Sequence, residues 1–359
     1  MKRKIIAFYL PQFHEIPENN DAWGKGFTEW VNVKKAKPLF WGHNQPRVPL
    51  NKNYYCLDNP KVMEEQISLA KQYGIYGFCF YHYWFKGKKV LEKPVEKMLH
   101  NENANMPYCF AWANEAWTKT WHGAGGEKEV LIRQTYGTQT DWQDHYRYLR
   151  HFFNDINYIK KDNKPILLIY KINNMRHRSE MFEYFNKSAI DDGFDGIYII
   201  QMLSNEDPKS KLKWINGYVD FEPAHIRNMM RQNAKKEKVS LVKQQLSKMN
   251  IFNRWTCDIL DYEKVCNELI CTEHASNYFR GLFVDYDDSP RRGKKALIFK
   301  NVSPKKFGVF LQKSIEKSQI EGNEYIFINA WNEWGEGAYL EPDEKNGYSY
   351  LEEIRRRNL

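Results

Sequence analysis

The chain has 359 residues, of which 42% are hydrophobic and 28% are charged, a composition that excludes wholesale disorder. Its formal net charge of +9 permits attraction to nucleic acid, anionic membranes or acidic sugar polymers. No apolar run approaches the roughly 18 residues of a membrane span. The six apolar residues before Pro11 are too few for a secretory signal, so we expect a cytoplasmic protein.

Short apolar segments alternate with helical patterns along the chain. The predicted strands are 5–10, 77–83, 108–113, 166–170, 196–202, 218–221, 281–284 and 325–330. The predicted helices are 61–73, 93–101, 140–159, 179–192, 208–215, 304–320 and 348–357. Eight such units predict an α/β fold, a (β/α)₈ TIM barrel that forms one catalytic domain over residues 1–359.

Two stretches are too long to be simple connections, at about 11–59 and 223–280. We expect both insertions at or beside the C-terminal face of the barrel strands, where barrel active sites lie. The second contains a basic segment, 227–248, with apolar residues at helical spacing. We expect this segment to pack on the barrel, and peripheral membrane association is the alternative. Its lysines lack interleaved aromatic residues, so we predict no nucleic-acid partner.

Aromatic residues make up 16% of the chain, and eight of the 12 tryptophans precede residue 143. Several stand beside polar residues near the ends of predicted strands, where flat rings and hydrogen-bonding groups together suit a sugar. The alternative is that they are large core residues. We predict a glycan pocket lined by Tyr9, Gln12, His14, Trp23, Glu29, Trp30, His82, Trp84, Trp112, Asn114, Glu115, Trp117, Asp285, Trp331, Asn332 and Trp334.

Glu333 and Glu336 stand three residues apart after the last predicted strand, between tryptophans and glycines. Cleavage of a glycosidic bond needs one carboxylic acid to protonate the leaving oxygen and a second carboxylate as base or nucleophile. Neighbouring indoles would desolvate one carboxyl group and raise its pKa, as a general acid requires. We predict that both are catalytic, and the alternative is a glutamate that caps a turn. Neither the cysteines nor the histidines have metal-ligand spacing, so we predict no metal and no cofactor.

Six segments resemble the WbsX-like family, whose members occur in bacterial O-antigen and capsule loci and are named as glycosyltransferases. The segments are 8–14, 24–30, 45–47, 77–84, 112–115 and 331–337. That family is in turn similar to the glycoside hydrolase family 99 endo-α-1,2-mannosidases, which are (β/α)₈ barrels. The second resemblance is carried mainly by 331–337.

The mannosidase resemblance implies roles for the two glutamates. Glu333 would deprotonate the substrate's own 2-hydroxyl, which attacks C1 to give a 1,2-anhydro sugar. Glu336 would act as acid and then as base for water, with net retention. The resemblance therefore implies an endo-acting retaining hydrolase of a bacterial surface polysaccharide, such as O-antigen or capsule, or of its lipid-linked precursor in lipopolysaccharide biosynthesis. The expected partner is an oligosaccharide or polysaccharide.

Three alternatives stay open. Glu115 could be the acid, with Glu333 as a direct nucleophile. A nucleotide-sugar glycosyltransferase could use Asp285 and Asp287 to hold Mg²⁺ or Mn²⁺ against a diphosphate. A non-catalytic glycan-binding protein would keep the tryptophans but would not need two glutamates in one motif.

Overall fold

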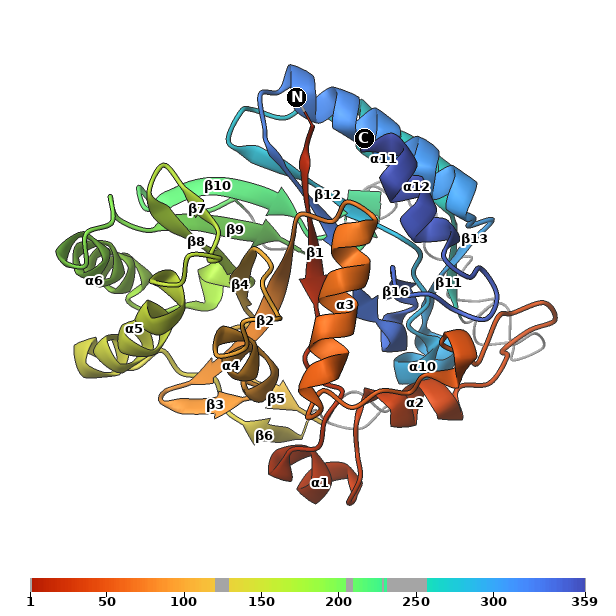
Figure 1. The fold of residues 1–359 in the computed structure, drawn as a ribbon, viewed down its shortest axis with the longest axis horizontal. Helices are drawn as coiled ribbons and strands as arrows, with labels where there is room; N and C mark the ends of the chain where they lie inside the picture. Colours follow the sequence, from red (N-terminus) through yellow and green to blue (C-terminus); the bar gives the residue numbers. More distant parts are fainter. Residues whose placement is uncertain (1, 120–128, 205–208, 228, 231–256, 359) are drawn as a thin grey trace, which may run out of the picture.

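The computed structural model describes residues 2–119, 129–204, 209–227, 229–230 and 257–358. Eight parallel strands close into a barrel, because β1 (Lys4–Tyr9) pairs with both β2 (Gly77–Phe85) and β14 (Tyr325–Asn329) (Figure 1). The other barrel strands are β4 (Tyr108–Trp112), β8 (Lys164–Ile169), β9 (Tyr198–Leu203), β10 (Ile215–Asp220) and β12 (Tyr278–Phe283). The predicted TIM barrel and its eight strands are confirmed.

Helices lie between the barrel strands and cover the outside of the barrel (Figure 1). They are α3 (Pro60–Gln72), α4 (Lys93–Leu99), α5 (Gln139–Phe153), α6 (Arg178–Asp191), α9 (Tyr262–Cys271), α11 (Pro304–Ile320) and α12 (Ser349–Arg357). Local sequence sets their ends. In α3 the Asn59 side chain accepts the Lys61 amide and Pro60 opens the helix, while Gly74 follows its end at φ +85°.

Two helix predictions are wrong in part. The predicted helix 140–159 ends at Phe153, because the amide of Ile159 donates to the carbonyl of Tyr108 in β4 instead of continuing a helix. The predicted helix 208–215 is absent from residues 209–215, and Ile215 begins β10 in register with Ile199 of β9. In both cases pairing with a barrel strand overrides local helix propensity.

The first insertion, 11–59, forms α1 (Pro17–Trp23), α2 (Glu29–Lys35) and a short 3₁₀ turn (Leu50–Lys52). Figure 1 shows α1 and α2 beyond the tip of β1, together with α10 (Ser289–Arg292), which follows β12. Short strands surround the same end of the barrel. They are β3 (Lys88–Val90), β5 (Trp117–Thr118), β6 (Val130–Ile132), β15 (Asn332–Glu333) and β16 (Ala338–Tyr339). The first insertion therefore helps to build the C-terminal face.

The described part of the second insertion holds α9 and β11 (Asp258–Asp261), which pairs with β13 (Leu297–Lys300). The predicted boundary at 280 is too late, because β12 already begins at Tyr278. At the other side of the barrel β7 (Lys160–Lys161) forms a hairpin with β8. Most of the basic segment 227–248 lies outside the described residues, so its packing or membrane association stays a prediction.

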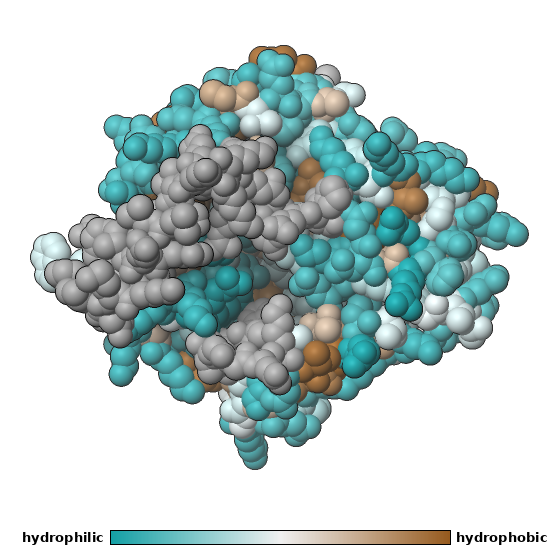
Figure 2. Space-filling view, turned by 180° about the vertical axis from the view of Figure 1, so that it is seen from behind, coloured by the Kyte–Doolittle hydropathy of each residue, from teal (hydrophilic) through white to brown (hydrophobic). Residues whose placement is uncertain are grey.

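Aromatic side chains fill the barrel interior. Phe8 of β1 lies 5.3 Å from Phe221, 5.7 Å from Phe327 and 5.9 Å from Tyr81, measured between ring centroids. Figure 2 shows one face of the molecule, whose described part is largely hydrophilic with hydrophobic residues in small separate groups. No described helix has both the length and the apolarity to cross a membrane. Much of the aromatic content thus serves the core.

Candidate active site

The chain after β14 folds into a tight hairpin that carries both predicted catalytic residues. Strands β15 and β16 pair antiparallel around the 3₁₀ turn Trp334–Glu336. Gly337 closes this turn at φ +63°, where a Cβ atom would stand 2.9 Å from the Arg47 guanidinium carbon. A side chain at this position would be both strained and crowded. Glycine therefore lets the hairpin present Glu333 and Glu336 together.

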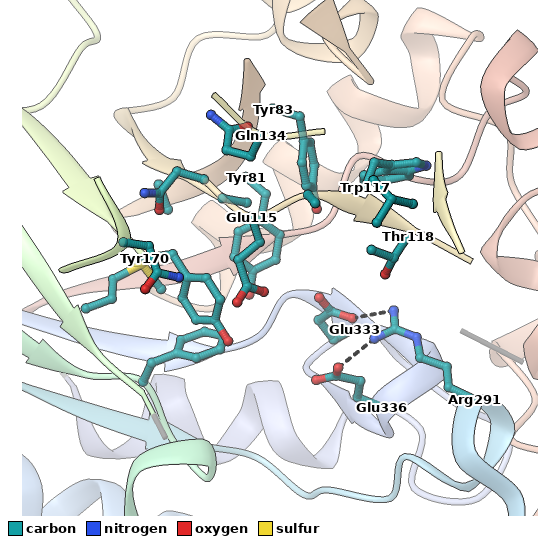
Figure 3. A pocket seen from close by; sticks show the side chains of 18 of the residues that line it. Tyr81, Tyr83, Glu115, Trp117, Thr118, Gln134, Tyr170, Arg291, Glu333 and Glu336 are labelled. Carbon is teal, nitrogen blue, oxygen red and sulfur yellow. Dashed lines mark hydrogen bonds and ion pairs between the residues drawn. The ribbon is translucent and has the colours of Figure 1, made fainter. Parts of the chain in front are cut away.

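Both glutamates face a cavity of about 720 Å³ at the C-terminal ends of the strands (Figure 3). Its wall combines phenol, indole, amide and carboxyl groups with a few apolar side chains. The lining residues include Tyr81, Tyr83, Asn114, Glu115, Trp117, Thr118, Gln134, Tyr136, Tyr170, Asn174, Met202, Phe221, Asp288, Arg291, Arg292, Glu333 and Glu336. Volume and lining suit a polar ligand with flat apolar faces.

Arg291 of α10 organises the carboxyl groups. Its Nη1 donates to Glu336 Oε1 at 2.6 Å, and its Nη2 donates to Glu333 Oε2 at 2.9 Å. Its Nε donates to Glu29 Oε1 of α2 at 2.9 Å. One guanidinium thus holds three carboxyl groups from two other segments, and the fork geometry fixes Glu333 beside Glu336.

The charge balance favours a shared proton in this cluster. Three ionised carboxylates around one guanidinium would leave a net negative charge in a buried site. Burial, with Glu336 and Glu29 adding to it against Arg291, raises the pKa of Glu333 to about 8. Burial likewise raises the pKa of Glu29. Burial in this cluster therefore moves the protonation of Glu333 towards neutral pH.

Substitution of Arg291 tests this arrangement. Arg291→Leu is expected to lower the free energy of unfolding by about 3–5 kcal/mol at pH 8, because buried carboxylates lose their counter-charge. Arg147→Leu is the matched control: it pairs with Asp144, both side chains are at least half exposed (60% and 50%), and the ion pair should contribute less than about 1 kcal/mol. Urea denaturation measures both. Equal losses would mean that Arg291 is not the centre of the cluster.

Five predicted site residues line the cavity: Asn114, Glu115, Trp117, Glu333 and Glu336. Figure 3 shows Glu115 across the cavity from Arg291, with its carboxyl group pointing towards the glutamate pair. The other predicted binding residues do not line it. They are Tyr9, Gln12, His14, Trp23, Glu29, Trp30, His82, Trp84, Trp112, Asp285, Trp331, Asn332 and Trp334.

The tryptophans of this second group pack in the interior. Trp84 and Trp112 each lie 4.6 Å from the buried His145 ring, whose Nε2 is 2.9 Å from His82 Nε2. Trp331 is fully buried, 5.2 Å from Phe78. The prediction that these rings contact a sugar is wrong, because they are buried in the protein core and do not line the cavity.

Near the hairpin that carries Glu333 and Glu336, Trp334 stacks on Tyr339 at 3.7 Å and donates to Glu341 at 2.6 Å. Trp30 lies 5.5 Å from Trp334, and Trp23 stacks on Phe27. These indoles support the shape of the hairpin and of the first insertion. They do not reach the cavity.

The polar residues of the group hold the loops in place. Tyr9 donates its hydroxyl to Gln66, and His14 Nδ1 bonds the Pro11 carbonyl. The Asn332 side chain accepts the Leu10 amide and donates to the Leu10 carbonyl. The Gln12 carbonyl accepts the amide of Glu29. Of these residues, Glu29 is linked to Glu333 and Glu336 through Arg291.

Asp285 and Asp287 do not fit a metal–diphosphate site. Arg47 donates to Asp285 at 2.8 Å, while His43 and Gln45 contact one oxygen of Asp287 at 2.8 and 2.7 Å. These contacts fasten the loop at 43–47 to the barrel. Both carboxylates are thus engaged by the protein's own side chains.

Sequence reasoning missed Arg291 and the tyrosines of the wall. Tyr81 and Tyr83 lie on β2 beside the predicted His82 and Trp84, but they point to the opposite face and line the cavity. Arg291 follows Pro290 at the start of a short helix after a barrel strand. Its position just after the seventh barrel strand, where barrel active sites lie, is the sequence signal that could have identified it.

A comparison with known families identifies the chain: the model of the family described as "Glycosyltransferase WbsX" matches residues 5–354. The chain belongs to the WbsX family. The protein WxcX of Xanthomonas campestris pv. campestris is 33% identical to it over 356 residues, which are 98% of this chain and 49% of WxcX. This WbsX chain spans about half the length of the curated relatives it matches.

Solved structures of similar fold include a "Glycoside hydrolase-like protein", with a TM-score of 0.58, 12% identity and coverage of 99% of this chain and 94% of that one. The GH99 endo-alpha-mannosidase from Bacteroides thetaiotaomicron has a TM-score of 0.56, 13% identity and coverage of 98% and 95%. At these identities the likeness concerns the fold. The expected resemblances to the WbsX family and to the GH99 fold are confirmed.

Proposed function

We propose that this WbsX-family protein is a retaining, endo-acting glycoside hydrolase of a bacterial surface polysaccharide or its precursor. The observation that carries the proposal is the pair Glu333 and Glu336 on one guanidinium, at the edge of a sugar-sized cavity. Glycoside hydrolysis generally needs two carboxyl groups at the scissile bond, one as acid and the other as base or nucleophile. A binding protein has no need for a pair that is costly to bury.

In the proposed mechanism, Glu333 takes the proton of the substrate's 2-hydroxyl while that oxygen attacks C1. Glu336 protonates the departing glycosidic oxygen, which leaves a 1,2-anhydro sugar. Glu336 then takes a proton from water, the water oxygen opens the anhydro ring at C1, and Glu333 returns its proton to O2. Two inversions at C1 give net retention. A base with a raised pKa suits the first step, because a sugar hydroxyl is a weak acid.

The proposal is tested with a panel of purified O-antigen and capsular polysaccharides. Wild-type protein should generate new reducing ends with at least one of them, and proton NMR of the first product should show the anomer of the substrate. Inverted product would contradict the proposal. Binding without any new reducing end would favour the non-catalytic glycan-binding alternative.

Glu115 distinguishes the proposed mechanism from a direct displacement. As a residue that holds a sugar hydroxyl, Glu115→Gln should raise KM about tenfold and change kcat less than about threefold. As the general acid, the same change would lower kcat by about 10²–10⁴-fold. Steady-state kinetics on the cleaved polysaccharide separates the two. A 2-fluoro glycoside that trapped an adduct on Glu333 would also favour direct displacement.

The family description makes glycosyl transfer the second candidate. A retaining site can pass its sugar to an acceptor hydroxyl instead of water. The engagement of Asp285 and Asp287 by Arg47, His43 and Gln45 argues against a metal–diphosphate donor site at these residues. Calorimetric titration with UDP- and GDP-sugars in the presence of Mn²⁺ tests it, and micromolar binding of either would move the assignment to transfer.

A further inference from the structure

A second cluster of ionisable side chains lies at the end of β10, on the side of the strand away from the cavity. Phe221 lines the cavity, whereas its neighbours Asp220 and Glu222 are not among the lining residues. Asp220 and Glu222 instead gather with His225, and one ligand atom from each of the three lies within 4.8 Å of the others. None of these residues takes part in the proposed glycosidase chemistry.

The spacing of these atoms matches a metal coordination shell. Asp220 Oδ1 is 2.7 Å from His225 Nδ1, and Glu222 Oε1 is 3.5 Å from the same nitrogen. Ligand atoms around an ion at about 2.1 Å stand roughly 3.0–3.4 Å apart in octahedral or tetrahedral geometry. The two observed separations bracket this range. The three side chains can thus converge on one ion with small adjustments.

Glu222 supplies a second, independent observation. Its side chain is 0% exposed, and Oε2 accepts the amide of Ile226 at 3.0 Å. Its other oxygen, Oε1, has no close hydrogen-bond donor, and its ion-pair contact with His225 Nδ1 is long, at 3.5 Å. A buried carboxylate oxygen without a hydrogen bond is costly unless another group compensates it. A cation between Glu222, His225 and Asp220 would compensate it.

The surroundings of Asp220 resemble the outer shell of a metal site. Tyr278 donates its hydroxyl to Asp220 Oδ1, and His274 Nε2 lies 3.3 Å from Asp220 Oδ2. The His274 ring stacks on Tyr278 with centroids 3.9 Å apart. Such contacts orient a ligating carboxylate and are a regular feature of metal sites.

We propose that Asp220, Glu222 and His225 bind one divalent transition-metal ion, with Zn²⁺ and Mn²⁺ as the best matches. Imidazole and carboxylate together suit these ions better than Ca²⁺ or Mg²⁺, which prefer oxygen ligands alone. The ligands come from the end of β10 and the start of the second insertion, and His274 comes from the segment before β12. The ion would therefore fasten the two ends of that insertion beside the cavity wall formed by Phe221.

The test uses the full chain, treated with EDTA and dialysed. Titration with ZnCl₂ and with MnCl₂ should show about one site, and melting temperature should rise by roughly 5 °C at about 100 times the Kd. Glu222→Gln removes a direct ligand and should weaken binding by at least about 100-fold, because loss of an outer-shell partner alone costs about 10–100-fold. Glu180→Gln is the matched control, because Glu180 forms the same i,i+3 carboxylate–histidine pair with His177 on an exposed surface. It should bind the metal as the wild type does.

Anomalous scattering from crystals soaked in ZnCl₂ provides a measurement that does not depend on a variant. A peak between Asp220, Glu222 and His225 is expected. An absent peak, or unchanged metal affinity in a folded Glu222→Gln variant, would overturn the proposal. The cluster would then be an ion-pair network around a protonated His225.

Discussion

Glu333→Gln is expected to lower turnover by about 10³-fold while leaving the protein folded. Glutamine keeps the shape of the side chain but cannot accept or return a proton, and a positioned acid or base contributes about 10²–10⁴-fold. Arg291 keeps Glu29 and Glu336 as partners in this variant. Loss of one of three carboxyl groups around a single guanidinium should thus not unfold the site.

The same variant should become relatively more stable as pH rises. The folded-state pKa of Glu333 is raised to about 8 by burial, so the native state binds its proton more tightly than the unfolded chain does. Stability from this group is present below the unfolded value near 4.5 and is lost as pH rises towards 8. Glutamine does not undergo this loss. Between pH 5 and pH 9 we expect the free energy of unfolding of Glu333→Gln to rise by roughly 1–3 kcal/mol relative to the wild type. Each pKa unit corresponds to about 1.4 kcal/mol, and the neighbouring carboxyl groups titrate together with Glu333, so the full shift does not count for this residue alone.

Glu353 on α12 is the control for this variant. It is also buried, but it pairs with two cations, Arg356 and Arg357, and does not line the cavity. Glu353→Gln should retain full turnover and lose stability. Kinetics and urea denaturation at pH 5, 7 and 9 measure both variants. Parallel loss of activity and stability in Glu333→Gln would indicate that Glu333 is a structural cap.

Glu336→Gln should lose turnover as strongly on natural substrate, but for a different reason. Glu336 is assigned the proton of the departing oxygen, which an activated leaving group does not need. An aryl glycoside of the cleaved sugar should thus recover part of the activity of Glu336→Gln and none of that of Glu333→Gln. Equal rescue of both would contradict the separate roles.

The sequence predicted the barrel because its eight strands are apolar runs bounded by turn residues, a local signal. The position of Glu333 and Glu336 at the cavity was also predictable, since a carboxyl doublet at a strand end is visible within seven residues. Apart from Trp117, the positions of the predicted tryptophans were not, because the composition around a residue does not say which face of its element the side chain takes. On β2, alternate residues point to opposite faces, so Tyr81 and Tyr83 line the cavity while His82 and Trp84 pack outside it.

The ends of the helices and the central position of Arg291 in the site could not be predicted from the local sequence. Residues 154–159 read as helix, yet Ile159 bonds to Tyr108, 51 positions earlier. Arg291 meets Glu29 across 262 positions of chain. Such contacts depend on closure of the barrel, which brings the first insertion against α10.

The pH dependence of kcat/KM provides the sharpest test of the roles of the two glutamates. Under the proposed mechanism, Glu333 must be ionised in the free enzyme to accept the proton of the 2-hydroxyl. Because its pKa is raised to about 8, kcat/KM should fall below that value with a slope that approaches tenfold per pH unit, or roughly 50-fold from pH 8 to pH 6. If Glu333 were the acid instead, activity would be retained at pH 6 and lost above pH 8.

Glu29→Gln is expected to shift the pH dependence of kcat/KM to lower pH. The negative charge of Glu29 helps to raise the pKa of Glu333, after burial and together with Glu336. Its removal frees more of the Arg291 charge for Glu333, so the acidic limb should move to lower pH and activity at pH 6 should increase relative to pH 8. An unchanged limb in Glu29→Gln, in a variant that melts like the wild type, would mean that the limb belongs to a group outside the Arg291 cluster. The assignment of Glu333 as the base would then fail.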